Sequence, residues 1–186
     1  MQVSTNAQRY TLRALEPEDL ELLYSIENDD SIWKIGASNV PYSKYVLRDY
    51  IANSHNDIYM DGQVRLMIEN EPKEAIGLVD LINFNPTHSR AELAIVLVET
   101  YRYQGIGQAV VKEICRYADE ILHLNQIYAI VDKNNQPCLQ CLQSIGFEEG
   151  AVLKRWLYTN KAYTDALLLQ YFLCLLLYVH LHFPDF

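Results

Sequence analysis

The sequence predicts a single domain of the α/β class, with a mixed sheet of roughly six to seven strands flanked by about four helices. Three observations lead to this prediction. The chain has 186 residues, which suits one domain with a proper core. Half of its residues are apolar, and no stretch is of low complexity. Strand-like and helix-like segments follow one another in the order β α α β β β α β α β β.

In the first half of the chain, alternation and turn residues mark the elements. The opening strand alternates apolar and polar residues, and Pro17 suits the first position of the helix after it. A turn around Pro72 joins two strands into an antiparallel hairpin. The expected elements are a strand at 10–15, helices at 17–28 and 45–52, and hairpin strands at 64–69 and 75–82.

In the second half, an apolar strand is followed by an amphipathic helix whose apolar residues recur at helical spacing. A later helix stops at Gly146, a residue that suits the position after a helix end. The expected elements are a strand at 91–98, a helix at about 106–122, a strand at 126–131, a helix at 137–145, and strands at about 151–158 and 162–172.

Composition restricts the possible partners and the location of the protein. The formal net charge of −9 argues against nucleic acid as a partner and is compatible with a cationic substrate such as an amine. The four cysteines do not reach the density of a disulfide framework, so a cytoplasmic location is expected. The first six residues lack the apolar segment of a signal peptide, and none is expected.

The run from Arg102 to Gly107 lies between the apolar strand and the amphipathic helix. This layout directs backbone N–H groups and the positive end of the helix dipole at one spot, which predicts a phosphate or pyrophosphate site. The glycines let the backbone come close to the anion. A Walker loop is excluded because no Gly-Lys-Ser/Thr follows Gly105, and a dinucleotide fold would place its glycine loop after the first strand.

The constellation resembles the GNAT superfamily of acyl-CoA-dependent N-acetyltransferases. Their loop signature is met by Arg102-x-x-Gly105-x-Gly107, and a second segment is met by Asn135 and the pair Gly146-Phe147. The resemblance covers residues 10–173 and is closest in look to spermidine N-acetyltransferases and ribosomal-protein N-terminal acetyltransferases. It implies transfer of an acetyl group from acetyl-CoA to a primary amine, either a small amine or a polyamine such as spermidine, in a direct ternary complex.

The resemblance also implies which residues hold the cofactor. Backbone groups at the end of the strand would pair with the pantetheine arm, and an N–H of Val96 or Leu97 would hold the oxyanion. Asn135 would hydrogen-bond the pantetheine from the other side. The expected cofactor-binding residues are Ile95, Val96, Leu97, Val98, Arg102, Tyr103, Gln104, Gly105, Ile106, Gly107, Gln108 and Asn135.

Glu92 is the candidate general base that takes a proton from the amine. A carboxylate is unusual in an otherwise apolar strand, and desolvation raises the pKa of a carboxylate toward useful base strength. The alternative is a solvated residue at the start of the strand, paired with Arg90 or His88. Many family members carry a tyrosine as general acid four residues before the Gly-Phe pair, where this chain has Leu142, so the acid is unassigned. A CoA-binding regulator without catalysis is therefore a further alternative.

Cys138 and Cys141 form a C-x-x-C pair at the start of a helix, which invites a redox interpretation. The chain has no second such pair for zinc, and its order of elements is not that of thioredoxin. The histidines show no spacing of metal ligands. We therefore expect packed thiols and no metal.

The acceptor is the least determined part of the prediction. Spermidine acetyltransferases carry a Glu-Glu-Pro-Tyr stretch between the first two helices, whereas this chain has Asn39-Val40-Pro41-Tyr42. Tyr42 is expected to bind substrate together with Glu92, and ordinary helix packing is the alternative. The loss of the two carboxylates leaves the N-terminus of a ribosomal-type protein open as a second acceptor.

The chain ends in an apolar run that has no counterpart in the family pattern. We expect the acetyltransferase domain at residues 1–174 and an apolar extension at 175–186, which packs on the domain or on a second subunit of a homo-oligomer. Membrane contact is not expected, because no basic cluster flanks the run.

Overall fold

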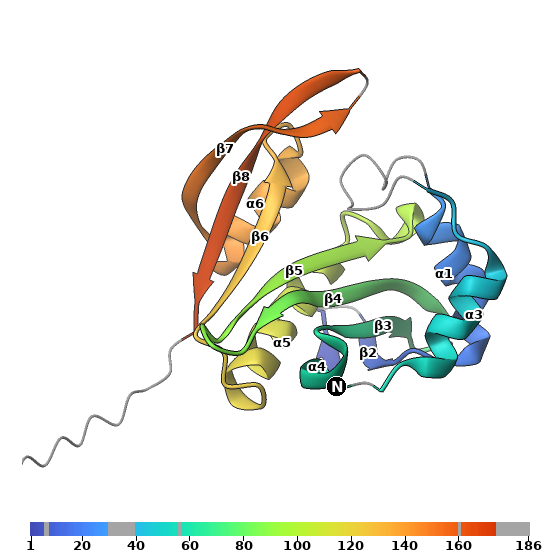
Figure 1. Cartoon of the computed structure of the whole chain (residues 1–186). Coiled ribbons are helices and arrows are strands. Elements are labelled where there is room, and N and C mark those ends of the chain that lie inside the picture. Colours follow the sequence, from blue (N-terminus) through green and yellow to red (C-terminus); the bar gives the residue numbers. More distant parts are fainter. Residues whose placement is uncertain (6–7, 30–39, 56, 160, 174–186) are drawn as a thin grey trace, which may run out of the picture.

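An eight-stranded sheet in the order β1-β2-β3-β4-β5-β6-β8-β7 runs through the protein (Figure 1). The computed structural model describes residues 1–5, 8–29, 40–55, 57–159 and 161–173. All neighbouring strands are antiparallel except β5 and β6, which are parallel. The strands are β1 (Gln2–Ser4), β2 (Arg9–Ala14), β3 (Val64–Asn70), β4 (Ala75–Asn85), β5 (Arg90–Leu97), β6 (Gln126–Asp132), β7 (Glu148–Thr159) and β8 (Ala162–Phe172).

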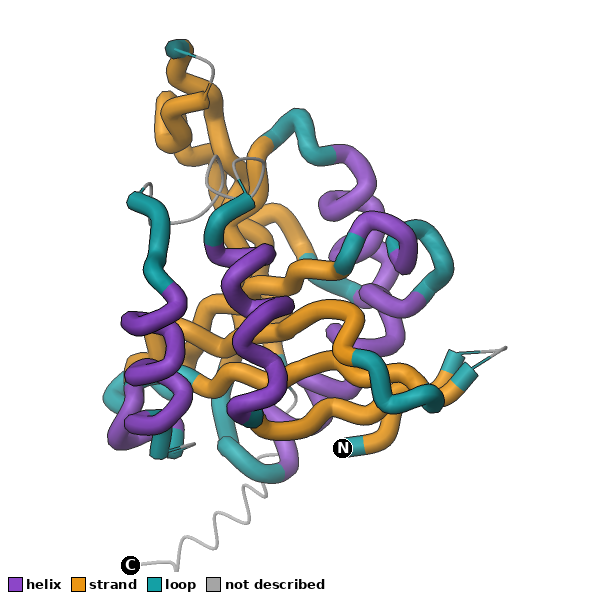
Figure 2. Tube along the Cα trace, turned by 90° about the vertical axis from the view of Figure 1, so that its right-hand side faces the viewer, coloured by secondary structure: helices purple, strands orange, loops and turns teal. Residues whose placement is uncertain are grey.

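Helices lie on both sides of the sheet (Figure 2). The α-helices are α1 (Leu20–Glu27), α3 (Lys44–Asn53), α4 (Ile58–Asp61), α5 (Ile106–Glu120) and α6 (Gln136–Ile145), with 3-10 turns η1 (Pro17–Asp19) and η2 (Glu99–Tyr101). Among the described residues, no helix is long and apolar enough to cross a membrane.

Two buried clusters lie on opposite faces of the sheet. The main core contains Ala91 and Leu93 of β5 and apolar residues of α5 and α6, such as Val110 and Leu142. The second cluster joins α1 and α3 to the other face, and Val96 of β5 packs against it. Because side chains alternate along a strand, Glu92 and Val96 share the face that carries α1 and α3.

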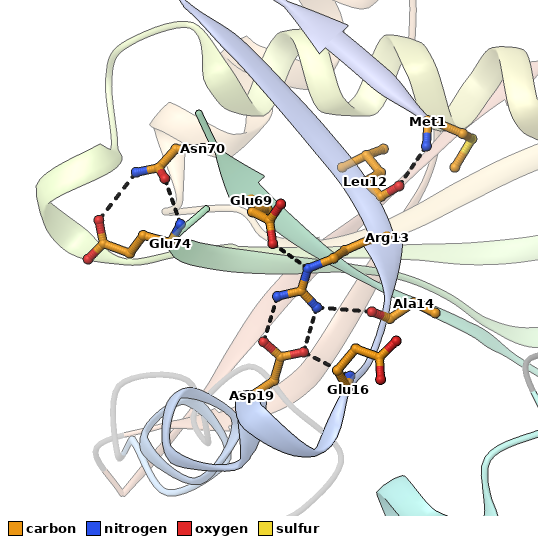
Figure 3. Close-up of polar contacts among 9 residues, drawn as sticks. All are labelled: Met1, Leu12, Arg13, Ala14, Glu16, Asp19, Glu69, Asn70 and Glu74. Carbon is orange, nitrogen blue, oxygen red and sulfur yellow. Dashed lines mark hydrogen bonds and ion pairs between the residues drawn. The ribbon is translucent and has the colours of Figure 1, made fainter. Parts of the chain in front are cut away.

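The start of α1 is fixed to the sheet by Arg13 of β2 (Figure 3). Its guanidinium forms two hydrogen bonds of 2.6 and 2.8 Å with Asp19, which is 4% exposed. A third bond of 2.6 Å joins it to Glu69 of β3. A two-pronged guanidinium–carboxylate pair is geometrically specific, so it fixes where α1 crosses the sheet.

The parallel pairing of β5 with β6 ends early. Its register covers only Arg90/Gln126, Ala91/Ile127 and Glu92/Tyr128. β5 continues to Leu97 beside β4, while β6 diverges from β5 and stays paired with β8 along its whole length (Figure 1). The second half of β5 is therefore unpaired on its β6 side. We call this divergence of the two strands the opening between β5 and β6, and its narrow end is the pair Glu92/Tyr128.

The predicted α/β class and mixed sheet are confirmed, and the described residues contain one strand and one α-helix more than expected. β1 pairs with β2 through only three residues, and α4 has a single turn, so neither is long enough to show a period. The strand expected from residue 151 starts earlier, at Glu148. The helix before it ends at Ile145 and is capped by Gly146, which has φ of 114°. The apolar extension at 175–186 lies outside the described residues.

Candidate active site

Backbone groups of β5 face the opening between β5 and β6. The N–H of Val98 donates to the carbonyl of Ile76 at 2.9 Å, and bonded pairs alternate along an antiparallel ladder. By this alternation Val96 pairs with Leu78 of β4, whereas the N–H groups of Ile95 and Leu97 point away from β4. Of the two N–H groups predicted for the oxyanion, that of Leu97 has the direction toward the opening.

β4 approaches this end of β5 so closely that only glycine fits at position 77. A Cβ on Gly77 would lie 2.3 Å from the carbonyl oxygen of Val96 and 3.0 Å from Cδ2 of Leu97. Atoms at such separations overlap, so a larger residue would move the backbone of β5. Gly77 thus sets the position of the strand that borders the opening.

The glycine loop leads from this end of β5 into α5. Gly105 adopts φ of 78° and is the N-cap of α5 without a side-chain cap. Within the described chain, the N–H groups of Ile106, Gly107 and Gln108 have no hydrogen-bond acceptor, and the first intrahelical bond runs from Ala109 to Gly105. Free N–H groups at the positive end of a fifteen-residue helix form a site for an anion.

The side chains of the loop hold its shape. Arg102 donates from Nε to the carbonyl of Leu97 at 2.8 Å, and Gln104 donates to the carbonyl of Thr100 at 2.8 Å. Gln108 donates to Oγ of Ser144 at 2.9 Å, which joins the start of α5 to α6. Tyr103 is 86% exposed, with φ of 63°. The predicted loop residues therefore lie together: the side chains of Arg102, Gln104 and Gln108 are engaged locally, and the amides at the start of α5 are free.

Glu92 lies half-buried at the narrow end of the opening. Its Oε2 accepts a hydrogen bond of 2.9 Å from Nδ2 of Asn83. Asn83 adopts φ of 51° inside an irregularity of β4 between Ile82 and Asn85. Such bulges redirect a side chain, here toward the carboxylate. In the described part of the chain Glu92 forms no ion pair with Arg90 or His88, so the pairing considered as the alternative is not found.

Tyr128 of β6 is the register partner of Glu92 and the residue that the sequence prediction missed as part of the site. Its pKa is raised, first by burial and then by the charge and hydrogen bonding of Glu92, whereas Arg90 acts in the opposite direction. The sequence shows only a tyrosine in an apolar strand, because the strand register that places it beside Glu92 is a long-range feature.

Asn135 lies beyond the end of β6 and is the N-cap of α6. Its Oδ1 accepts from the N–H of Cys138 at 3.3 Å, so this oxygen is used for capping. No hydrogen bond to its Nδ2 is found within the described chain. The amide nitrogen is therefore the atom of Asn135 that is free to bind a ligand.

The helix that follows carries no acidic or redox group in a reactive state. Leu142 is 2% exposed in the main core and has no proton to donate. Burial raises the pKa of Cys138 to about 11, with a contribution from Cys141, and burial also raises the pKa of Cys141. Thiols of this kind react slowly. No group of three potential metal ligands occurs among the described residues.

Tyr42 is placed by two hydrogen bonds between its backbone and the side chain of Asn28, of 2.8 and 3.1 Å. Tyr42 packs against the second cluster, and so does Val96. Tyr42 is thus on the same face of the sheet as Glu92. Tyr45 of α3 is 77% exposed and is not one of the residues that pack against this cluster.

A buried charge network supports this face. Arg65 of β3 forms two hydrogen bonds of 2.9 and 2.8 Å with Asp80 of β4 and one of 2.6 Å with Glu27 of α1. Burial alone would lower the pKa of Arg65, but the charge and hydrogen bonds of Asp80 outweigh it and the pKa is raised. The ring of Tyr50 of α3 lies 5.6 Å from the guanidinium carbon. The network thereby joins α1 and α3 to the middle of the sheet.

The fold and this opening define a class of protein, namely an α/β domain with an anion site at the start of α5, beside a sheet that divides between β5 and β6. A family model described as the acetyltransferase (GNAT) domain matches residues 9–148. The chain belongs to the GNAT acetyltransferase family, and it is an acetyl-CoA-dependent N-acetyltransferase.

Several known proteins are similar to this chain over most of their length. The spermidine N(1)-acetyltransferase of Escherichia coli (strain K12) is 28% identical over 162 residues, which cover 87% of this chain and 85% of that protein. The spermidine N(1)-acetyltransferase of Vibrio cholerae is 29% identical over 155 residues, which cover 83% of this chain and 88% of that protein. The putative ribosomal N-acetyltransferase YdaF of Bacillus subtilis is 26% identical over 165 residues, which cover 85% of this chain and 88% of that protein.

The fold is also similar to solved structures. The crystal structure of the Vibrio cholerae spermidine N-acetyltransferase in complex with CoA and spermine matches with a TM-score of 0.79 at 28% identity. The match covers 90% of this chain and 97% of that chain. The similarity in sequence and the similarity in structure therefore agree on the family.

Proposed function

We propose that the protein acetylates a primary amine of a polyamine such as spermidine, using acetyl-CoA in a direct ternary complex. The observation that carries the proposal is the arrangement around β5, with free amides of the glycine loop at one end of the opening and the Glu92 carboxylate at the other. The similarity to two spermidine acetyltransferases and the net charge of −9 support a polycationic acceptor.

The cofactor would lie along the opening. In this proposal the amides from Tyr103 to Gln108 hold the pyrophosphate, and Arg102 supports the loop through Leu97. The backbone of residues 95–98 pairs with the pantetheine arm, and Nδ2 of Asn135 bonds it from the α6 side. The N–H of Leu97 stabilises the oxyanion that forms on the thioester carbonyl.

The amine would approach from the face that carries α1 and α3. An alkylammonium has a pKa of about 10 and must lose a proton before its nitrogen can attack. Glu92 accepts this proton, directly or through water, while Asn83 keeps the carboxylate in place. Tyr42 contributes an apolar wall for the acceptor chain from the same face.

A second acceptor is favoured by a specific similarity. The putative ribosomal N-acetyltransferase of Bacillus subtilis shares 26% identity with this chain. The N-terminal amine of a ribosomal-type protein is therefore the alternative substrate. The core position of Leu142 favours a third possibility, a CoA-binding regulator without turnover.

A panel of amines tests these alternatives. Purified protein with acetyl-CoA is offered spermidine, spermine, simple alkylamines and peptides with free N-termini, and thiol release is followed. We expect saturable release with polyamines and none above background with peptides. Saturable release with peptides alone would select the N-terminal acetyltransferase, and tight CoA binding without any release would select the regulator. A Glu120→Gln variant serves as a control and should give the same amine preference as the wild type, because this carboxylate pairs with Arg116 on the exposed side of α5.

We also propose that the protein acts in the cytoplasm as a homo-oligomer, with the domain at 1–174 and the extension at 175–186 as a subunit contact. The apolar character of the extension and the 60% exposed side chain of Phe172 at the end of β8 support this proposal. Removal of residues 175–186 should reduce the oligomeric size in sedimentation experiments. An unchanged size would exclude the extension as the contact.

A further inference from the structure

The general acid has no candidate at the position where the family carries its tyrosine, because Leu142 is an apolar residue of the main core. A proton donor for the departing thiolate would have to lie near Glu92, at the narrow end of the opening. The residue that meets this condition is Tyr128, the last residue of β6 that is still paired with β5.

The geometry of the sheet sets the direction of Tyr128. Its neighbours Ile127 and Ala129 are 0% and 2% exposed in the main core, so the tyrosine points to the opposite face. Paired residues of parallel strands share a face, and Tyr128 therefore lies on the same side of the sheet as Glu92. The next residues of β5, from Leu93 onward, have no partner in β6.

The surroundings of the phenol keep it protonated and oriented. Burial, and then the charge and hydrogen bonding of Glu92, raise its pKa, whereas the charge of Arg90 acts in the opposite direction. Glu92 in turn is held by Asn83 at 2.9 Å. After Glu92 has taken a proton from the amine, it can pass that proton to the phenol oxygen while the phenol gives its own proton to the departing thiolate.

We propose that Tyr128 is the general acid of the reaction, and this proposal rests on the acetyl transfer proposed above. The neutral amine nitrogen forms a bond to the thioester carbon, and the carbon–sulfur bond breaks. The first proton of the ammonium has by then passed through Glu92 to water, so Glu92 is ionised when the neutral amine attacks. One proton of the attacking nitrogen then passes to Glu92, the phenol proton of Tyr128 passes to the CoA sulfur, and the phenol oxygen takes back the proton held by Glu92. The products are the amide and CoA thiol, and both side chains return to their starting states.

Two measurements test this assignment. In protein labelled with ¹³Cζ-tyrosine, the resonance of Tyr128 is identified by its loss in the Tyr128→Phe variant. We expect CoA to shift this resonance and desulfo-CoA, which lacks the thiol, to leave it near its position in the free protein. In turnover, Tyr128→Phe should lower kcat about 100-fold with the KM for acetyl-CoA little changed. Tyr117→Phe is the matched control, because burial alone raises the pKa of that tyrosine, on α5.

The outcomes separate this inference from the proposed acceptor. The kcat comparison uses whichever amine the wild-type protein acetylates best, so that a different acceptor overturns the polyamine proposal and leaves Tyr128 testable. Wild-type kcat in Tyr128→Phe, or equal shifts with CoA and desulfo-CoA, would overturn the role of Tyr128. A wild-type protein that acetylates no amine would overturn both proposals.

Discussion

Glu92 is the residue on which the proposed chemistry depends most. Its carboxylate is half-buried on the face of the sheet that carries α1 and α3, which we call the acceptor face. Among the described residues of β4, only Asn83 donates a side-chain hydrogen bond to it. In the proposed mechanism, partial exposure gives the amine access to the carboxylate, and the bond from Asn83 fixes its orientation. This is the arrangement that general base catalysis requires.

Replacing Glu92 by Gln should lower kcat about 100-fold, because the amide cannot accept the proton of the ammonium group. The residual rate should increase with pH toward the pKa of the free amine, about 10, since only amine that is already neutral can attack. Steady-state kinetics between neutral and alkaline pH measure both effects. Wild-type kcat with an unchanged pH profile would exclude Glu92 as the base.

The two cysteines of α6, in contrast to Glu92, are predicted to be chemically unreactive. With its pKa at about 11, Cys138 is almost entirely protonated near neutral pH, and Cys141 is shifted in the same direction. Both should react with iodoacetamide more slowly than a free thiol, and Cys138→Ala combined with Cys141→Ala should retain CoA binding. Rapid labelling of either cysteine would restore the redox interpretation of the pair.

At the scale of elements, β5 is the strand that arranges the site, and β4 sets its position. A Gly77→Ala substitution places a Cβ within 2.3 Å of the Val96 carbonyl oxygen, so the backbone of β5 must move. Because misplacement by about 1 Å can reduce turnover strongly, we expect kcat/KM for acetyl-CoA to fall by about 10- to 100-fold.

Gly62→Ala provides the control for this substitution. Gly62 has φ of 67° but nothing within 4 Å of its would-be Cβ, so alanine there strains only the local backbone. Its kcat/KM should remain near that of the wild type. Equal losses in both variants would mean that general destabilisation, and not the position of β5, explains the effect.

The sequence predicted these elements to different degrees. Long periodic segments such as α5 and β4 were predicted, because their patterns extend over many residues. The turn of α4 was missed, since Asp57 caps only four helical residues. The glycine loop could be located because its chemistry is local. Tyr128 and Gly77 could not, because their importance follows from strand register and from close contact between neighbouring strands.

At the scale of the whole molecule, the buried network around Arg65 connects both helices of the acceptor face to the sheet. Asp80 is 4% exposed and accepts two hydrogen bonds from the guanidinium. A charge left alone in such a place is costly, because no water replaces its partner. The network therefore ties the integrity of the acceptor face to the stability of the fold.

An Asp80→Leu variant leaves the charge of Arg65 with Glu27 as its remaining ion-pair partner. We expect the free energy of unfolding to fall by about 3–5 kcal/mol, as measured by denaturant titration. Arg116→Ala, which removes exposed ion pairs on α5, should change it too little to resolve. Similar small effects in both variants would show that the Arg65 network does not support the fold.

The most direct test of the proposed function follows the acetyl group itself. Wild-type protein is incubated with spermidine and acetyl-CoA that carries ¹³C in the acetyl group, and the products are analysed by mass spectrometry and NMR. The account predicts a labelled acetyl group on a primary amine nitrogen of spermidine, with one CoA released for each acetyl transferred. Unmodified spermidine beside intact acetyl-CoA would contradict it.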